Sequence, residues 1–264
     1  MITAQNVSNH LLQLREQSPL VHNITNYVAM NNTANALLSI GASPVMAHAP
    51  EEMEAMAGIA SALVLNIGTL SKEWIDGMLI AGKTASNRGI PVVLDPVGAG
   101  ATPYRTQSCH RIIGECHPSI IRGNASEIMA LISSDVKTKG VDSTESSEKA
   151  LELAKTLAKE TGTVVSISGP KDLITDGNDV ISIHNHVPLM PKITGMGCTA
   201  SSLTGAFAAT GDDNMSSAAV AMAIMAVAGE MAVMAAQGPG SFQMHFLDSL
   251  YNMTDLDIAK HLKI

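Results

Sequence analysis

The stretch ALVLNIGTLSKEWIDGMLIAGKTASNRGIPVVLD, residues 62–95, decides the fold that we expect. It holds two short apolar runs, at 62–67 and 91–95, on either side of a helical pattern at 72–87. Neither run alternates apolar with polar residues, and such continuous strands are typical of a parallel sheet with helices on both faces. The stretch therefore predicts a strand, a helix and a second, parallel strand.

The same alternation of strands and helices extends over the first two-thirds of the chain. Further strands are expected at 43–47, 119–122 and 164–168, and further helices at 27–39, 51–57, 106–115, 125–132 and 145–160. Two more strands, near 173–175 and 180–184, meet at Asp176-Gly177-Asn178, which is typical of a β-hairpin. We predict an α/β fold with a mostly parallel sheet and an antiparallel edge. No linker or repeat interrupts the chain, so a single domain over 1–264 is expected.

Composition excludes several classes of protein. With 46% hydrophobic and 15% charged residues in 264, the chain can bury a core and is not disordered. Its net charge of -8, with no basic cluster, argues against a nucleic-acid partner. Three scattered cysteines are too few for a disulfide framework, and no secretory signal opens the chain, so a cytoplasmic setting is expected.

One segment is apolar enough to be compared with a membrane-spanning helix. Residues 218–236, AAVAMAIMAVAGEMAVMAA, are nearly long enough to span a bilayer, but Glu230 interrupts them. A carboxylate inside a span costs about 2.5–3.5 kcal/mol, and alanine offers little to offset it. We interpret the segment as a buried helix of a soluble core, and expect no membrane partner.

Candidate site residues follow the predicted strands, because ligands of an open parallel sheet bind beyond the carboxyl ends of its strands. The residues at these ends include Asp95, Arg122 and Ser168, and Asn124 and Glu127 come just after the second of them. Asp95 and Glu127 could hold Mg²⁺, and Arg122 offers a planar fork to a phosphate group. Taken singly, each is also explained as a turn, cap or surface residue.

The turn Gly195-Met196-Gly197-Cys198 precedes a long apolar helix. Its glycines allow a tight turn, and the helix start carries about half a positive charge, so the turn suits a developing anion. A plain strand-to-helix turn is the simpler interpretation. Cys198 has three interpretations: a buried core residue, a nucleophile or a proton acceptor. We expect the helix start to lower its thiol pKa, and no histidine can be placed beside it for a nucleophile.

Residues 22–27, HNITNY, are interpreted as the entry to a helix, with Thr25 or Asn26 as its cap. Trp74, His184 and His186 are assigned no chemistry.

Five segments together resemble the hydroxyethylthiazole kinases, which are ribokinase-like enzymes. They are HNITNYVAMNNTANALLSIGASPVMAHAPEE (22–52), ALVLNIGTL (62–70), PVVLDPVGAGAT (91–102), IIRGNASEI (120–128) and KITGMGCTASSLTGAF (192–207). The resemblance runs from about residue 20 to about residue 240. It implies a three-layer α/β/α fold, and transfer of phosphate from ATP, with Mg²⁺, to the hydroxyethyl group of 4-methyl-5-(2-hydroxyethyl)thiazole in thiamine salvage. It also implies a homotrimer with active sites between subunits.

The resemblance assigns roles to the residues found above. Asn26, Met46 and Gly195 fall in the thiazole pocket. Arg122 and Ser168 contact ATP, Asn124 belongs to a metal-linked motif, and Asp95 with Glu127 organises metal and phosphates. Gly195 to Cys198 form the anion hole, with Cys198 where most ribokinase-like enzymes have an aspartate base. Met196 is bulkier than the threonine often found in that turn.

Other functions remain open from sequence. A kinase for another alcohol, such as a hydroxymethylpyrimidine or a sugar, would share the phosphate apparatus. A dinucleotide-dependent dehydrogenase is disfavoured because no Gly-x-Gly-x-x-Gly follows the first strand. A regulatory nucleotide-binding module without turnover would carry the same binding residues.

Overall fold

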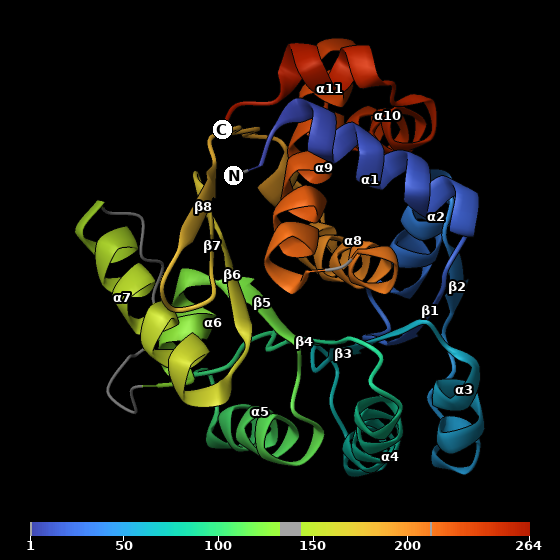
Figure 1. Ribbon diagram of the computed structural model, residues 1–264, viewed down its shortest axis with the longest axis vertical. Coiled ribbons are helices and arrows are strands. Elements are labelled where there is room, and N and C mark those ends of the chain that lie inside the picture. The colour runs from blue at the N-terminus through green and yellow to red at the C-terminus, as the bar shows by residue number, and fades with distance from the viewer. Residues whose placement is uncertain (1, 133–143, 212) are drawn as a thin grey trace.

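Eight strands form one mixed sheet in the order β2-β1-β3-β4-β5-β6-β7-β8 (Figure 1). The computed structural model describes residues 2–132, 144–211 and 213–264. From β2 to β6 all neighbours pair in parallel, whereas β7 runs antiparallel to both β6 and β8. The strands are β1 (Leu20–Ile24), β2 (Ser43–Val45), β3 (Ala62–Asn66), β4 (Val92–Asp95), β5 (Ile120–Asn124), β6 (Val164–Ser168), β7 (Asp172–Thr175) and β8 (Val180–Ile183). The predicted α/β fold with an antiparallel edge is confirmed.

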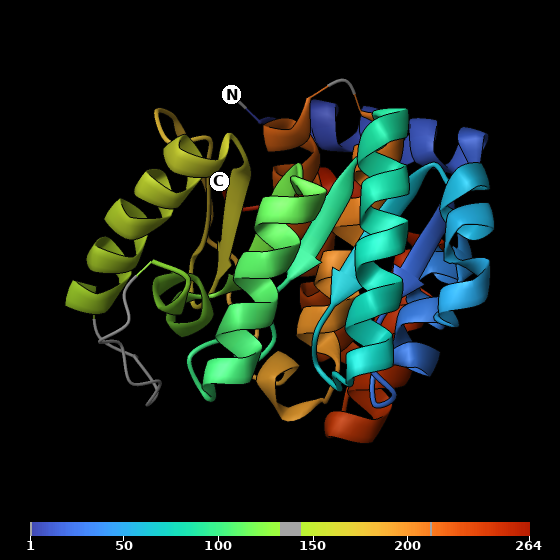
Figure 2. The same ribbon diagram turned by 90° about the horizontal axis from the view of Figure 1, so that it is seen from below.

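Helices cover both faces of this sheet, which gives three layers (Figures 1 and 2). One face carries α1 (Ala4–Gln17), α2 (Met30–Ile40), α8 (Met196–Thr210), α9 (Asn214–Ala235), α10 (Pro239–Asn252) and α11 (Asp255–His261). The other carries α3 (Met53–Ile59), α4 (Lys72–Arg88), α5 (Pro103–Cys116), α6 (Ala125–Ala130) and α7 (Thr144–Thr161). Two short 3-10 helices, η1 (Pro50–Glu52) and η2 (Met190–Lys192), lie in connections.

Each central strand contributes side chains to two separate hydrophobic cores, one on each face of the sheet. Val64 belongs to the core with α8 and α9, whereas its neighbours Leu63 and Leu65 belong to the core with α4 and α5. This is the period-two alternation of a strand, here with both faces buried.

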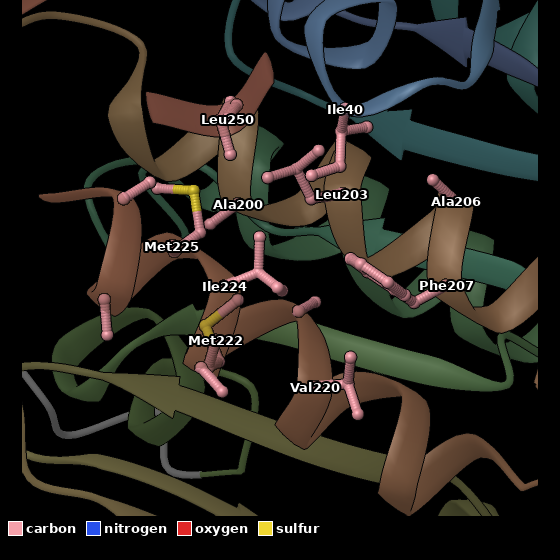
Figure 3. Close-up of a cluster of buried hydrophobic side chains, with 14 of the residues drawn as sticks. Ile40, Ala200, Leu203, Ala206, Phe207, Val220, Met222, Ile224, Met225 and Leu250 are labelled. Atoms are coloured by element: carbon pink, nitrogen blue, oxygen red, sulfur yellow. The ribbon is translucent and has the colours of Figure 1, made fainter. Parts of the chain in front are cut away.

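The core between α8 and α9 consists of closely packed small and apolar side chains (Figure 3). Phe207 and Ile224 are fully buried in it. By length and composition α9 could cross a membrane, but 72% of its most apolar window is buried inside the protein. It is a core helix, as its sequence predicts.

The sequence pattern does not predict β1, and the interpretation of residues 22–27 as a helix entry is wrong for residues 22–24, which belong to this strand. His22 and Asn23 are polar yet completely buried in this strand. Asn23 accepts a hydrogen bond from the Ser202 hydroxyl at 2.7 Å, and His22 Nε2 lies 3.0 Å from the Ala47 carbonyl oxygen. Polar strand residues with buried partners conceal the apolar run, and α2 begins only at Met30.

The segment that follows α11 is hydrogen-bonded to the residues just beyond β8, at the edge of the sheet. The backbone N–H of His184 donates to the Lys263 carbonyl at 2.8 Å, and the Asn185 side chain donates to the His261 carbonyl at 2.7 Å. Glu230 on α9 accepts hydrogen bonds from Asn185 and Lys263. Side chains and backbone together fix this segment against the sheet.

Gly205 lets α8 lie directly on the sheet, and this contact can be tested. A Cβ at this position would meet Cγ2 of Val64 at 2.6 Å. We expect Gly205→Ala to lower the free energy of unfolding by about 1–2 kcal/mol, because overpacking outweighs the better helix propensity of alanine. Denaturant unfolding measures the change. As the control, exposed Gly114 on α5 has open space around it. Gly114→Ala should be neutral or stabilising by up to about 1 kcal/mol, and equal losses at both positions would contradict the close approach.

Candidate active site

A row of buried polar side chains crosses the sheet beneath α8. On five neighbouring strands, the residue two positions after a member of the α8-side core is polar. These residues are Asn23, Asn66, Asp95, Arg122 and Ser166, none more than 6% exposed. Buried polar groups need hydrogen-bond partners, so this row determines what can pack above it.

Asp95, at the end of β4, is the central member of the row. Its Oδ2 accepts a hydrogen bond from Asn66 Nδ2 at 2.7 Å and another from the Ser201 hydroxyl at 2.7 Å. Asn66 lies beside it on β3, and Ser201 comes from the second turn of α8. The carboxylate therefore joins the sheet to the helix.

The network continues from Asp95 to Asn26 and Cys198. Asn66 Oδ1 accepts from Asn26 Nδ2 at 2.9 Å, and the same Asn26 nitrogen lies 3.2 Å from the Cys198 sulfur. Asn26 Oδ1 in turn accepts from the backbone N–H of Ala29 at 3.0 Å, so the amide orientation is determined by its partners. Asn26 thus caps the turn before α2, and it also meets the predicted catalytic residue.

Burial controls the acidity of both ends of this network. It raises the pKa of Asp95 to about 6, and repulsion from Glu127 acts in the same direction, while Arg122, Ser201 and Asn66 oppose the rise. Burial also raises the pKa of the Cys198 thiol to about 11, with help from the Asp95 charge. The expectation of a lowered thiol pKa was wrong, because desolvation outweighs the helix start.

The start of α8 has the geometry expected of an anion-binding turn. Gly195 is the N-cap residue with φ +82°, and no side chain caps the helix there. Gly197 lies in the first turn, where a Cβ would come within 3.0 Å of the Arg122 Nη1. The first amide groups of α8 are therefore left for a ligand.

Arg122 is buried beneath this turn. Its Nη1 donates to the Gly197 carbonyl at 2.9 Å, and its Nε has no hydrogen-bond partner within the described ranges. An unpaired guanidinium nitrogen in a buried position favours binding of an acceptor from outside, such as a phosphate oxygen.

Glu127 links the loops that follow β4 and β5. Its two oxygens accept from the backbone N–H groups of Gly98 and Asn124, each at 2.9 Å. The Asn124 side chain accepts from the Glu127 N–H at 2.9 Å and completes a capping box for α6. Both residues therefore have structural partners in addition to their predicted roles.

The remaining predicted residues lie at the same edge of the sheet but make fewer recorded contacts. Ser168 ends β6 directly opposite Asn124 in register. Met46 comes directly after β2, the strand next to β1, and packs against the α8-side core. Hydrogen bonds thus connect Asp95 to Asn66, Asn66 to Asn26, and Asn26 to Cys198. Met46 and Ser168 lie on either side of this chain of bonds.

Three residues of the site were missed by sequence reasoning. Asn66 ends a strand in register with Asp95, so the strand-end rule could have found it. Ser201 is three residues after Cys198, on the same face of a helix. Arg105 on α5 gave no signal, yet it donates to the carbonyls of Ile67, Val97 and Gly68 at 2.8–2.9 Å. It ties together the loops after β3 and β4.

This arrangement suits the binding of an anionic group at the start of α8, near the Asp95 carboxylate. Comparison with solved structures agrees with the fold. Staphylococcus aureus pyridoxal kinase in complex with pyridoxal superposes with a TM-score of 0.62 at 19% identity, over 80% of this chain and 88% of that one. The fold is therefore that of the ribokinase-like kinases.

The sequence places the chain within that class more narrowly. Residues 11–255 match the hydroxyethylthiazole kinase family. The chain is 53% identical over 264 residues to the hydroxyethylthiazole kinase of Syntrophus aciditrophicus, covering 100% of this chain and 98% of the relative. It is 57% identical over 258 residues to that of Leptospira biflexa, covering 98% and 97%. The structure of the hydroxyethylthiazole kinase protein from Pyrococcus horikoshii superposes with a TM-score of 0.91 at 40% identity, over 98% of each chain. The chain belongs to the hydroxyethylthiazole kinase family and is an enzyme of that kind.

The raised pKa of Asp95 predicts a pH-dependent stability in the protein without metal or nucleotide. The unfolded side chain loses its proton near its ordinary value of 3.8, and the buried one near 6. Because the folded state binds more protons between these values, the stability that Asp95 contributes is present at low pH and is lost as pH rises through about 6. From about pH 4.5 to about pH 7.5, the free energy of unfolding of the wild type should fall by about 2 kcal/mol relative to Asp95→Asn.

Denaturant titrations of both proteins at each pH measure this difference. Glu54→Gln, on an exposed position of α3, serves as the control and should track the wild type. A wild-type curve parallel to that of Asp95→Asn would show that Asp95 does not titrate in this range.

Proposed function

We propose that this kinase transfers the terminal phosphoryl group of ATP to the hydroxyl of 4-methyl-5-(2-hydroxyethyl)thiazole, with Mg²⁺, as a step of thiamine salvage. The observation that carries the proposal is the bonded chain from Asp95 through Asn66 and Asn26 to Cys198 beside the uncapped start of α8. It connects a metal-binding carboxylate, a substrate-binding amide and an anion-binding turn, which are the parts that phosphoryl transfer needs.

The residues present fit Mg²⁺, which prefers one or two carboxylates together with water and phosphate oxygens. Both hydrogen bonds to Asp95 from the described residues end on Oδ2, which leaves Oδ1 for an ion. Glu127 supplies a second carboxylate nearby. No cluster of three or more metal-ligating side chains occurs among the described residues. When bound, Mg²⁺ would neutralise charge on the phosphates of ATP.

Arg122, Ser168 and Asn124 are proposed to contact ATP, which would lie over the ends of β5 and β6. Asn26, Met46 and Gly195 are proposed to bind the thiazole alcohol over β1 and β2, on the other side of Asp95. The terminal phosphoryl group would then meet the hydroxyl at the start of α8. There the amides of Gly197 and Cys198 stabilise the charge that spreads over its oxygens.

Cys198 is proposed to accept the proton of the hydroxyl late in the reaction, in its thiolate form. With its pKa raised to about 11, the thiol keeps its own proton at neutral pH and is not a base in that form. Only about one molecule in ten thousand carries a thiolate at pH 7. The transition state of phosphoryl transfer is loose, so the attacking hydroxyl keeps much of its proton and a strong base is unnecessary.

We further propose that the chain acts as a single catalytic domain, in the cytoplasm, and as a homotrimer. Its three free cysteines suit a reducing compartment. For the trimer, the support is apolar surface: the packed helices α2 and α10 leave Leu38, Met244 and Tyr251 at least 55% exposed. Sedimentation equilibrium gives the subunit number.

ADP release by the purified protein tests the proposed reaction. Turnover should require ATP, Mg²⁺ and the thiazole alcohol together. A hydroxymethylpyrimidine offered in place of the thiazole tests for a kinase of another alcohol. ATP binding without turnover on any alcohol would overturn the proposal in favour of a regulatory nucleotide-binding module.

Substitutions at Cys198 should separate proton transfer from charge stabilisation. We expect Cys198→Asp to stay active, because aspartate is a competent proton acceptor, and Cys198→Ala to lose roughly 10- to 100-fold in kcat/KM. Asp95→Ala and Arg122→Ala should lose about 1000-fold or more. Cys116→Ala, at a buried cysteine on α5, is the matched control.

Steady-state kinetics with circular dichroism on each variant measure these losses in folded protein. If Cys198→Ala proves as inactive as Arg122→Ala, the thiol is an essential base and the late proton transfer is wrong.

A further inference from the structure

The protein has one tryptophan, and it lies in an aromatic cluster beside the proposed alcohol pocket. Trp74, in the first turn of α4, is 5% exposed. The His48 ring stacks on it, with centroids 4.3 Å apart and an interplanar angle of 15°. The Tyr27 ring meets it edge-on at 4.8 Å and 73°. The indole therefore lies between two rings from different connections.

Both neighbouring rings are close in sequence to the proposed thiazole-binding residues. Tyr27 directly follows Asn26, and His48 is two residues after Met46. Tyr27 belongs to the connection after β1, His48 to the one after β2, and Trp74 to the helix after β3. Contact through the indole thus couples the two segments that would form the walls of the pocket.

The segment that carries Met46 is also held by its backbone. The Ala47 carbonyl oxygen lies 3.0 Å from Nε2 of His22 on β1. The His48 carbonyl lies so close to Gly77 on α4 that a Cβ there would be only 3.1 Å from it. The indole stack adds a side-chain contact to these, so this segment lies against both β1 and α4.

The indole nitrogen of Trp74 is buried and finds no acceptor among the described residues. A buried donor without a partner is destabilising, and phenylalanine would not incur this cost. This cost offsets part of the stability that the larger ring gains by burial. The larger ring is long enough to contact both Tyr27 and His48.

We propose that Trp74 is a positioning residue for the acceptor alcohol: its ring holds the Asn26 turn and the Met46 segment at a fixed separation, and so sets the width of the pocket. The inference rests on the proposed function. It assigns Trp74 to the alcohol side of the site only, because the proposed ATP contacts lie across β5 and β6, on the other side of Asp95.

Substitution of Trp74 by phenylalanine separates this role from stability. The smaller ring cannot contact both neighbours, so we expect KM for the thiazole alcohol to rise roughly five- to twentyfold. KM for ATP and kcat should change by less than about threefold. The variant should unfold at a denaturant concentration close to that of the wild type, because the smaller ring loses burial but also removes the unpaired donor. His48→Phe, which keeps a stacked ring, should retain the wild-type KM, whereas His48→Ala should raise it.

Ile112→Val is the control, since Ile112 is a fully buried residue of α5 and is not one of the three aromatic rings. It should lower stability without changing either KM. Intrinsic fluorescence adds a direct readout, because emission from the single tryptophan reports on Trp74. The thiazole alcohol should change this emission saturably, at concentrations near its KM, and ATP alone should not.

The outcomes are distinct. A wild type inactive on the thiazole alcohol overturns the proposed function and this inference with it. If the wild type is active, two results would overturn the inference alone. One is an unchanged KM for the thiazole alcohol in Trp74→Phe, and the other is tryptophan emission that does not change when the alcohol is added. Equal increases in both KM values would also overturn it, because they would indicate a general loss of structure.

Discussion

Burial of the Asp95 carboxylate is the constraint on which the site depends. An ionised carboxylate taken out of water is stable only if other groups donate hydrogen bonds to it or oppose its charge. Asn66 and Ser201 provide the bonds, and the guanidinium of Arg122 provides the opposing charge. These three residues come from β3, α8 and β5, so satisfying one carboxylate determines the position of α8 over the sheet.

Close packing makes this arrangement possible. Gly205 allows α8 to approach Val64, and the polar residues two positions further along the strands then come within reach of the first turns of the helix. The same approach leaves the Arg122 guanidinium directly under the Gly197 carbonyl. Apolar contact along most of the helix and polar contact at its start are thus two parts of one interface.

Much of the fold could be predicted, because unbroken apolar strands such as those ending at Asn66 and Asp95 indicate a buried parallel sheet. β1 could not, since its buried histidine and asparagine look like loop residues until their partners are known. For the site, the strand-end rule finds Asp95 and Arg122 from sequence. It says nothing of Arg105, because two of its three carbonyl partners, Ile67 and Gly68, are distant in sequence. The acidity of Cys198 was misjudged because burial, which no motif encodes, opposes the helix start.

The segment after α11 also affects the behaviour of the sheet's outer edge. An uncovered edge strand offers unpaired N–H and C=O groups to other chains and invites aggregation. The bond between His184 and the Lys263 carbonyl occupies this edge just beyond β8, and the Glu230 and Asn185 contacts keep it occupied. At the opposite edge, β2 is only three residues long and includes Pro44. Both margins of the eight-stranded sheet are therefore poorer templates for the addition of a further strand than a long, uncovered edge would be.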